Sequence, residues 1–209
     1  MTPTTCFSLL LVLMLSGMPA IAGDEKGEAL YQRCAACHGD RGQGNQALKA
    51  PALAGQQADY LYRQLQQFQS GLRGSDARDV TGGLMRVQVK HLKADDLQVL
   101  ATYLGTLPSA SKGGAKTEAF SGRTGYNYYQ ASCGGCHGGR AEGNPAFSAP
   151  KLAGLSADYL TRQFRNYAEG IRGSDQSDRY GRQMRMMTRS LPDDKTLEQV
   201  IAYITAQQP

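Results

Sequence analysis

Most of this chain consists of two copies of one sequence, and that duplication limits the fold more than any other feature. The segment that starts CAACHGDRGQGN at Cys34 returns as CGGCHGGRAEGN at Cys133, a separation of 99 residues. About half of the positions from Cys34 to Leu92 recur identically at this separation, without a gap. Two copies are too few for a solenoid, in which stacked neighbours share one continuous core. The duplication therefore predicts two similar domains in tandem.

The separation between the copies slips at both flanks of the repeat. Tyr31 corresponds to Tyr129 at a separation of 98 residues, and Tyr103 corresponds to Tyr203 at a separation of 100. Between the copies, LPSASKGGAKTEAF has a composition typical of a linker. We therefore assign residues 23–107 to the first domain, 108–118 to the linker and 119–209 to the second domain.

The hydrophobic pattern of each copy predicts about three helices. One helix runs into the cysteine pair (EKGEALYQRC in the first copy), and another ends each domain. The helix between them follows a P-x-L-A-G turn, and in the first copy its apolar stripe consists of Tyr60, Leu61, Leu65 and Phe68. Strand-like alternation is absent, so the predicted fold is all-α, with two tandem domains related by duplication.

Each copy carries the sequence C-x-x-C-H, which is the attachment sequence of a c-type haem. Its residues are Cys34, Cys37 and His38 in the first copy, and Cys133, Cys136 and His137 in the second. Two thiols three residues apart on a helical turn reach the two vinyl groups along one edge of a haem. The histidine that follows is then carried under the iron as an axial ligand. The motifs predict two covalently bound haem c groups.

Other uses of paired cysteines fit this chain less well. A zinc site built from two C-x-x-C pairs separates them by about 15–20 residues, whereas these pairs lie in different repeats. A thioredoxin-type redox pair expects a βαβ context, which the pattern lacks. A disulfide framework is the ordinary use of cysteines in an exported protein, but it does not explain the histidine after each pair.

The second axial ligand of each iron has two candidate residue types. His91 is the only histidine outside the motifs, and it corresponds to Ser190 in the second copy, so we expect a surface residue there. Methionine is the other common sixth ligand of small cytochromes. The first copy contains a single methionine, Met85, whereas the segment GRQMRMMTRS of the second copy contains three.

Together these motifs resemble the cytochrome c4 family, whose members are di-haem proteins built from two class I cytochrome c domains. The resemblance covers essentially the whole mature chain. It rests on the two C-x-x-C-H sequences, the PALAG and PKLAG turns, the Y-L-x-R-Q helices, the R-G-S-D segments and the Met-x6-Leu entries to the last helices. Where the family usually has Ser after that Leu, this chain has Lys93 and Pro192, which alters the helix cap.

The resemblance implies a ligand set for both irons. His38 and Met85 would bind the first iron, and His137 and Met184 the second. Register within the repeat agrees, because Met184 lies 99 residues after Met85. Met186 and Met187 align with Val87 and Gln88, so we expect them to provide apolar packing near the haem edge.

Further residues have expected supporting roles. As in class I cytochromes, the carbonyl groups of Pro51 and Pro150 would accept a hydrogen bond from the Nδ1–H of the axial histidines and fix their orientation. The alternative is that these prolines only shape a loop. Two pairs of arginines are candidates for contact with the haem propionates, and surface arginines are the alternative for both: Arg73 with Arg172, and Arg86 with Arg185.

The N-terminus predicts export. Residues 1–22 combine an apolar run with the A-x-A-like sequence Ala20-Ile21-Ala22, which is typical of a cleaved signal peptide. No basic residue precedes the apolar run, so an uncleaved membrane anchor is the alternative. We expect a periplasmic protein and leave open a peripheral association with the membrane.

The expected function is the transport of single electrons from a respiratory donor to a terminal oxidase or a similar acceptor. No nucleic-acid partner is expected, because the basic residues behind the net charge of +5 are scattered. No catalytic residue or small-molecule substrate is expected either, because ligation by histidine and methionine would saturate both irons. One alternative is the electron-transfer subunit of a dehydrogenase complex. A di-haem peroxidase is a further alternative, but it needs an iron with an open sixth position, and two methionine ligands would close both.

Overall fold

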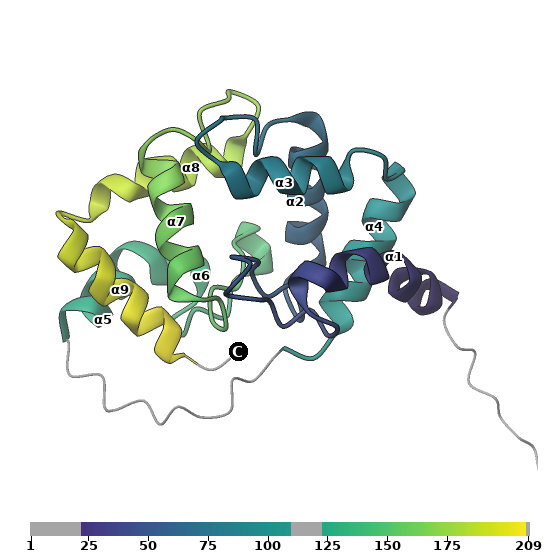
Figure 1. The fold of residues 1–209 in the computed structure, drawn as a ribbon. Coiled ribbons are helices and arrows are strands. Elements are labelled where there is room, and N and C mark those ends of the chain that lie inside the picture. The colour runs from purple at the N-terminus through teal and green to yellow at the C-terminus, as the bar shows by residue number, and fades with distance from the viewer. Residues whose placement is uncertain (1–21, 110–122, 208–209) are drawn as a thin grey trace, which may run out of the picture.

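The computed structural model describes residues 22–109 and 123–207, and within these ranges it consists of helices and connecting loops, without a β-strand. The four main helices of the first copy are α1 (Ala22–His38), α2 (Ala58–Ser70), α3 (Val80–Val89) and α4 (Ala94–Thr106). Those of the second copy are α5 (Arg123–Tyr129), α6 (Gly135–His137), α7 (Ala157–Ala168), α8 (Arg179–Met187) and α9 (Asp194–Ala206). Figure 1 shows the two sets side by side, as the all-α, two-domain prediction expected. The predicted signal peptide and most of the predicted linker fall outside the described residues.

In the first domain, the helix that carries the cysteines packs across the last helix. α1 and α2 both contact α4, and the core between them contains Tyr31, Leu65, Phe68 and Leu100. Gly27 permits the close crossing of α1 and α4, because a Cβ at this position would collide with the side chain of Tyr103. The apolar stripe predicted on the second helix is confirmed for Leu61, Leu65 and Phe68, which face this core, but Tyr60 is not part of it.

The second domain repeats this packing with different side chains. α5 packs against α9, and α7 also contacts α9. Its core contains Tyr129, Leu160, Leu197, Ile201 and Ile204. Two separate cores of similar composition explain how a duplicated chain folds as two domains rather than one.

The slip in register before the second cysteine pair has a structural explanation. One extra residue lies between Tyr129 and Cys133, compared with the first copy. The structure accommodates it as a π-helical turn over Gln130–Gly134, between α5 and α6. The tyrosines that precede the cysteines in the two copies consequently keep equivalent roles. Tyr31 donates a hydrogen bond to the carbonyl of Gly39 at 2.5 Å, and Tyr129 donates one to that of Gly138 at 2.7 Å.

The prediction of three helices per copy was incomplete, because a further helix carries the methionines. α3 and α8 each begin after an aspartate whose side chain accepts a hydrogen bond from a backbone N–H three residues later: Asp79 from Gly82 and Asp178 from Gly181. This is an N-cap, a signal that the sequence contains in both copies. The second helix, α2, ends at Ser70, and Gly71 follows in the left-handed conformation.

The second slip in register changes a helix cap. Lys93 precedes α4 and makes no capping hydrogen bond through its side chain. The extra residue of the second copy places Asp193 before α9, where its carboxylate accepts a hydrogen bond from the N–H of Thr196 at 2.7 Å. The departure from the family's serine at Pro192 is therefore offset by its neighbour.

Candidate functional site

The two C-x-x-C-H sequences lie at equivalent places, at the ends of helical segments. His38 is the last residue of α1, and His137 is the last residue of α6. Both histidine side chains are buried, at 4% and 5% exposure, whereas the second cysteine of each pair is exposed. The first cysteine of each pair is partly buried, so each domain places a buried imidazole beside one partly buried and one exposed thiol, an arrangement that suits a haem attached at its edge.

The orientation of each imidazole is fixed by a proline carbonyl. His38 Nδ1 lies 2.8 Å from the carbonyl oxygen of Pro51, and His137 Nδ1 lies 2.9 Å from that of Pro150. The prediction of this hydrogen bond is confirmed in both domains. With Nδ1–H donating to the carbonyl, Nε2 is left as the lone-pair nitrogen of the neutral ring, which is the form that binds a metal.

The protonation of both histidines suits the same role. Burial lowers the pKa of His38 and that of His137 below the usual value, although the hydrogen bond to each proline acts in the opposite direction. Both rings are therefore held neutral over a wider range of pH than an exposed histidine would be.

The methionines separate by burial as the register predicted. Met85 on α3 and Met184 on α8 are half-buried, and Met85 packs against the same core as Cys34. Met186 and Met187 are 64% and 41% exposed, and their packing near the haem edge stays a prediction. His91 is exposed, as predicted for a surface residue.

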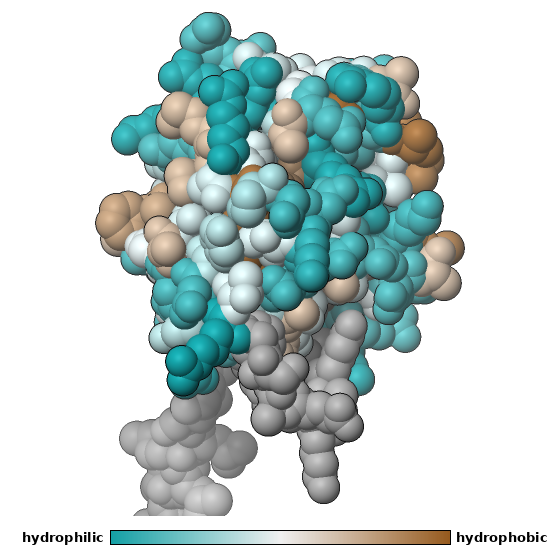
Figure 2. Space-filling view, turned by 90° about the vertical axis from the view of Figure 1, so that its left-hand side faces the viewer, coloured by the Kyte–Doolittle hydropathy of each residue, from teal (hydrophilic) through white to brown (hydrophobic). Residues whose placement is uncertain are grey.

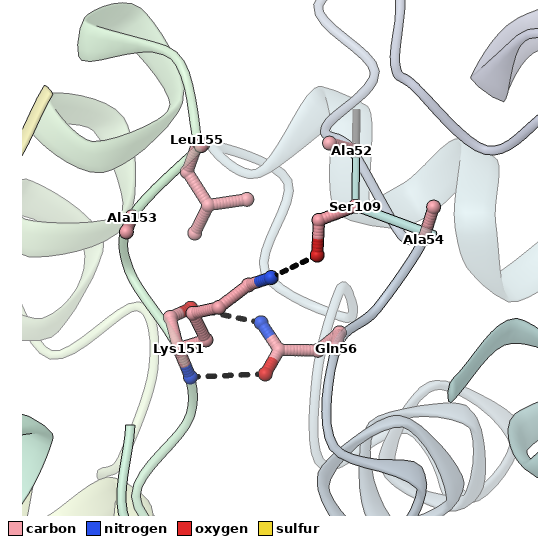
Figure 3. Close-up of a pocket in the computed structure, with 8 residues that line it drawn as sticks. Ala52, Ala54, Gln56, Ser109, Lys151, Ala153 and Leu155 are labelled. Carbon is pink, nitrogen blue, oxygen red and sulfur yellow. Dashed lines mark hydrogen bonds between the residues drawn. The ribbon is translucent and has the colours of Figure 1, made fainter. Parts of the chain in front are cut away.

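The two domains are joined by hydrogen bonds that run from side chains of one repeat to backbone groups of the other. Gln56 Nε2 donates to the carbonyl of Lys151 at 2.8 Å, and its Oε1 accepts from the Lys151 N–H at 2.9 Å. The Lys151 ammonium group donates to the Ser109 hydroxyl (Figure 3). Burial lowers the pKa of this lysine.

A second pair of contacts is symmetric between the repeats. Arg63 donates to the carbonyl of Ser148 at 2.8 Å, and its counterpart Arg162 donates to the carbonyl of Lys49 at 2.9 Å. Both acceptor residues have a positive φ, 53° for Ser148 and 56° for Lys49. Non-glycine residues rarely adopt this conformation, so its occurrence at both positions indicates that the two loops are shaped alike to present these carbonyl groups to the arginines.

Two buried arginines lie at the centre of the interface. Arg73 and Arg172 are 7% and 4% exposed, and each donates to the side-chain carbonyl oxygens of both Gln64 and Gln163. Arg73 also donates to the Tyr159 hydroxyl at 3.2 Å. The two guanidinium groups and the two glutamines thus form a closed ring of hydrogen bonds across the domain boundary.

This ring holds two buried positive charges, and the buried carboxylate beside it, that of Asp178, is hydrogen-bonded to Gln67 and to neither arginine. None of the ion pairs formed by the described residues involves Arg73 or Arg172, and the Nε of Arg73 has no hydrogen-bond partner. Burial alone would raise the pKa of Tyr159, but the two arginines lower it, with Arg73 the stronger influence. Buried charges are normally paired, so the ring is suited to receive an anionic group.

Beside the ring, one symmetric contact is missing. Gln67 Nε2 donates to Asp178 Oδ1 at 2.9 Å across the interface. In the symmetric position, Asn166 and Asp79 are both buried, and each has a side-chain atom without a hydrogen-bond partner. Asparagine is one methylene shorter than the glutamine that it replaces, which explains the gap.

We predict that Asn166→Gln stabilises the protein by restoring the missing contact with Asp79. A hydrogen bond to a buried charged group contributes about 1–2 kcal/mol. The free energy of unfolding, measured by denaturant titration of the haem-loaded protein, should rise by about this amount. The mirror-image control, Gln67→Asn, should lower it. A decrease for Asn166→Gln would show that the interface has no room for the longer side chain.

The chain was compared with known proteins. The family model described as cytochrome c matches residues 25–108 and again residues 123–208. The chain belongs to the cytochrome c family. Cytochrome c4 from Stutzerimonas stutzeri is 33% identical to it over 179 residues, 80% of this chain and 83% of that protein. A thiosulfate dehydrogenase electron acceptor from Stutzerimonas stutzeri (strain A1501) is 30% identical over 199 residues, 87% of this chain and 86% of that protein.

The fold leads to the same group. The crystal structure of reduced recombinant cytochrome c4 from Pseudomonas stutzeri superimposes with a TM-score of 0.73 at 28% identity, covering 88% of this chain and 98% of that one. The cytochrome c4 resemblance seen in the motifs is thereby confirmed. As a di-haem cytochrome c4, the chain is an electron-transfer protein rather than an enzyme, and it carries two covalently bound haem c groups.

The residues of this cytochrome c fit its haem groups. Each domain offers two thiols and a neutral imidazole at the end of one helical segment, and the buried arginines offer positive charge where carboxylates are lacking. The sequence had left open whether Arg73 with Arg172 or Arg86 with Arg185 would face propionates. Burial now favours the first pair, because Arg86 is exposed and Arg185 is only half-buried.

Gln64 and Gln163 were not among the site residues predicted from the sequence. A signal for them existed, since both glutamines recur in the Y-L-x-R-Q segments at the separation of the haem cysteines. They occupy inward positions of α2 and α7, where an apolar residue would be the ordinary choice.

Proposed function

We propose that this cytochrome carries single electrons between a respiratory donor and a terminal oxidase, with both irons bound by one histidine and one methionine. His38 and Met85 are the ligands of the first iron, and His137 and Met184 are those of the second. The four cysteines of the C-x-x-C-H sequences form the thioether bonds. Bound haem supplies the one-electron chemistry of iron, and the chain supplies its ligands and surroundings.

One observation carries the proposal: both domains repeat the same arrangement. In each, a buried histidine is oriented by a proline carbonyl, and a half-buried methionine lies on a separate helix at the same register. Methionine as the second ligand raises the reduction potential relative to a second histidine, which suits a carrier near the oxidase end of a respiratory chain. Two closed coordination spheres also argue against a peroxidase.

Arg73 and Arg172 are the proposed partners of the haem propionates. Their position between the domains would bring the charged edges of both haems to one place. The Gln64 and Gln163 oxygens hold the guanidinium groups in a fixed plane, so that little rearrangement is needed when an iron changes its charge. Such a shared cationic centre would favour electron exchange between the domains.

The place of action that we propose is the periplasm, after removal of residues 1–22. The described residues include no helix that is both long and apolar enough to cross a bilayer. A peripheral association with the membrane would bring the protein close to an oxidase. We also propose that residues 108–118 are the linker between a first domain that ends at residue 107 and a second domain that begins at residue 119.

A second candidate function is supported by one comparison. A thiosulfate dehydrogenase electron acceptor covers 87% of this chain at 30% identity. By that likeness, the donor would be a dehydrogenase that oxidises an inorganic sulfur compound. Reduction of the purified cytochrome by a thiosulfate dehydrogenase plus thiosulfate, at a rate that exceeds its reduction by quinol-oxidising membranes, would favour this function over the first.

The net charge leads to a test of protein–protein electron transfer. The polypeptide carries +5, and each oxidised haem adds one positive and two negative charges, which leaves +3 for the oxidised protein. Raising the ionic strength from about 0.01 M to about 0.15 M shortens the screening length from about 30 Å to about 8 Å. The second-order rate constant for reaction with an oxidase should therefore fall several-fold in stopped-flow experiments. A rate that does not respond to salt would remove charge steering from the proposal.

A further inference from the structure

α3 carries an apolar stripe that the fold does not use. Val80, Leu84 and Val87 are 70%, 64% and 67% exposed. Their spacing of four and then three residues places them on one face of the helix. Gly82 and Val89, which are buried, lie on the opposite face. The stripe therefore points away from the core and from the side on which Met85 lies.

The second repeat shows that an apolar surface is not required at this place. Of the three stripe positions, only Val87 has an apolar counterpart in the second repeat, the exposed Met186. The positions equivalent to Val80 and Leu84 are Arg179 and Gln183 on α8. Both side chains are exposed, and α8 forms a helix of nearly the same length. Viewed from the side of α8 and α9, the molecule presents mainly hydrophilic residues, with small and separated hydrophobic areas (Figure 2). Two copies of one helix thus differ in their outer surface while they share their inner one.

Charged residues border the stripe. Arg86 and Lys90 are exposed and lie along one side of it, and the exposed His91 continues its line beyond the helix end. An apolar strip with cations at its border is complementary to a surface that combines an apolar patch with carboxylates. That charge pattern does not complement a second copy of this chain at the same face, since it would place like charges together.

We propose that the face formed by Val80, Leu84 and Val87 on α3 is the docking surface for a redox protein that presents an apolar patch bordered by carboxylates. This inference rests on the proposed function, and it assigns electron exchange with that partner to the first domain. The stripe extends over about 10 Å, two turns of helix. An area on the order of a few hundred Å² is too small for a permanent complex and fits a short-lived electron-transfer encounter.

The test replaces the stripe with residues that the second repeat already tolerates. The double variant Val80→Arg with Leu84→Gln is prepared with both haems attached. Two partners serve as probes: the soluble copper-containing fragment of a bacterial terminal oxidase, and a thiosulfate dehydrogenase with thiosulfate. We expect the second-order rate constant with at least one of them to fall about five- to tenfold, the loss typical of removing a central apolar contact.

Three controls separate docking from other effects. The rate at which ferricyanide oxidises the double variant should equal that of the wild type, because a small ion needs no docking face. If the wild type exchanges electrons with neither protein partner, the proposed function itself is contradicted. The matched variant Gln183→Ala on α8 should react like wild type. Rate constants within twofold of wild type for the double variant with both partners would overturn the docking proposal alone. So would a dimer in sedimentation that the double variant abolishes, because it would assign the stripe to self-association.

Discussion

Met184→Ala is expected to remove about half of the near-infrared absorption band that arises from charge transfer between sulfur and ferric iron. With one thioether per iron, each methionine accounts for half of the band. The reduction potential of the second haem should fall by about 100 mV or more, since the axial ligands set haem potentials over a range of about 0.8 V. The reduced variant should also bind carbon monoxide, which the wild type should not.

Met85→Ala should give the same three changes at the first haem, and the double variant should lose the band completely. Met186→Leu is the matched control, because its side chain is exposed and its counterpart in the first repeat is Val87. It should leave the band and both potentials unchanged.

The neighbouring methionines provide a sharper test of the assignment. A Met184→Ala protein that retains the full band has recruited Met186 or Met187, or never used Met184. These cases are separated by comparing the triple variant Met184→Ala, Met186→Leu and Met187→Leu with the double variant Met186→Leu and Met187→Leu. If the pair without Met184→Ala already loses half of the band, the ligand assignment is wrong.

Arg73→Gln should lower the reduction potential of both haems, because it removes a buried positive charge that we place beside their propionates. A charge pair in partly buried surroundings interacts by roughly 1–2 kcal/mol, depending on distance. For a one-electron couple this corresponds to about 40–90 mV. Redox titration monitored in the visible haem bands measures the shift for the two haems.

Arg172→Gln should act in the same direction, and the two effects should not be additive, since both guanidinium groups share the Gln64 and Gln163 oxygens. Arg73→Lys should recover most of the potential while losing the planar hydrogen bonds. Arg86→Gln, at an exposed site, is the control and should shift the potential little. Unchanged potentials for both buried variants, with the haem spectra intact, would contradict the proposed propionate contact.

Much of the fold could be predicted because the sequence is duplicated, so that each copy could be compared with the other. A separation of 99 residues aligned cysteines, histidines and Met85 with Met184, and the two departures from it marked real features of the backbone. At one, a π-helical turn absorbs an extra residue; at the other, Asp193 becomes a helix cap. The helices around Met85 and Met184 were missed although both copies contain their N-cap aspartates, because these helices are short and only Met85 and Met184 were considered there, as iron ligands.

The interface was the least predictable part of the site. Hydrogen bonds to backbone carbonyl groups leave no pattern in the acceptor residues, and contacts between repeats depend on how the domains turn toward each other. Gln56 and Gln57 are an example: nothing in their sequence distinguishes them from surface glutamines, yet both donate across the boundary. The arginines were recognised as candidates, and our preference for Arg73 and Arg172 rests on their burial, which the sequence did not indicate.

The hydrogen bonds between the domains constrain the identity of their donor residues more than that of their acceptor residues. Gln56, Gln57, Arg63 and Arg162 supply side-chain donors, whereas Ala149, Ser148 and Lys49 supply only main-chain oxygens. Every amino acid has such an oxygen, so the accepting positions are free to drift as long as the loop keeps its shape. The donors are not. The side chains that join the domains, which also include those of the arginine–glutamine ring, are therefore constrained more tightly than the loop residues that offer only a carbonyl oxygen.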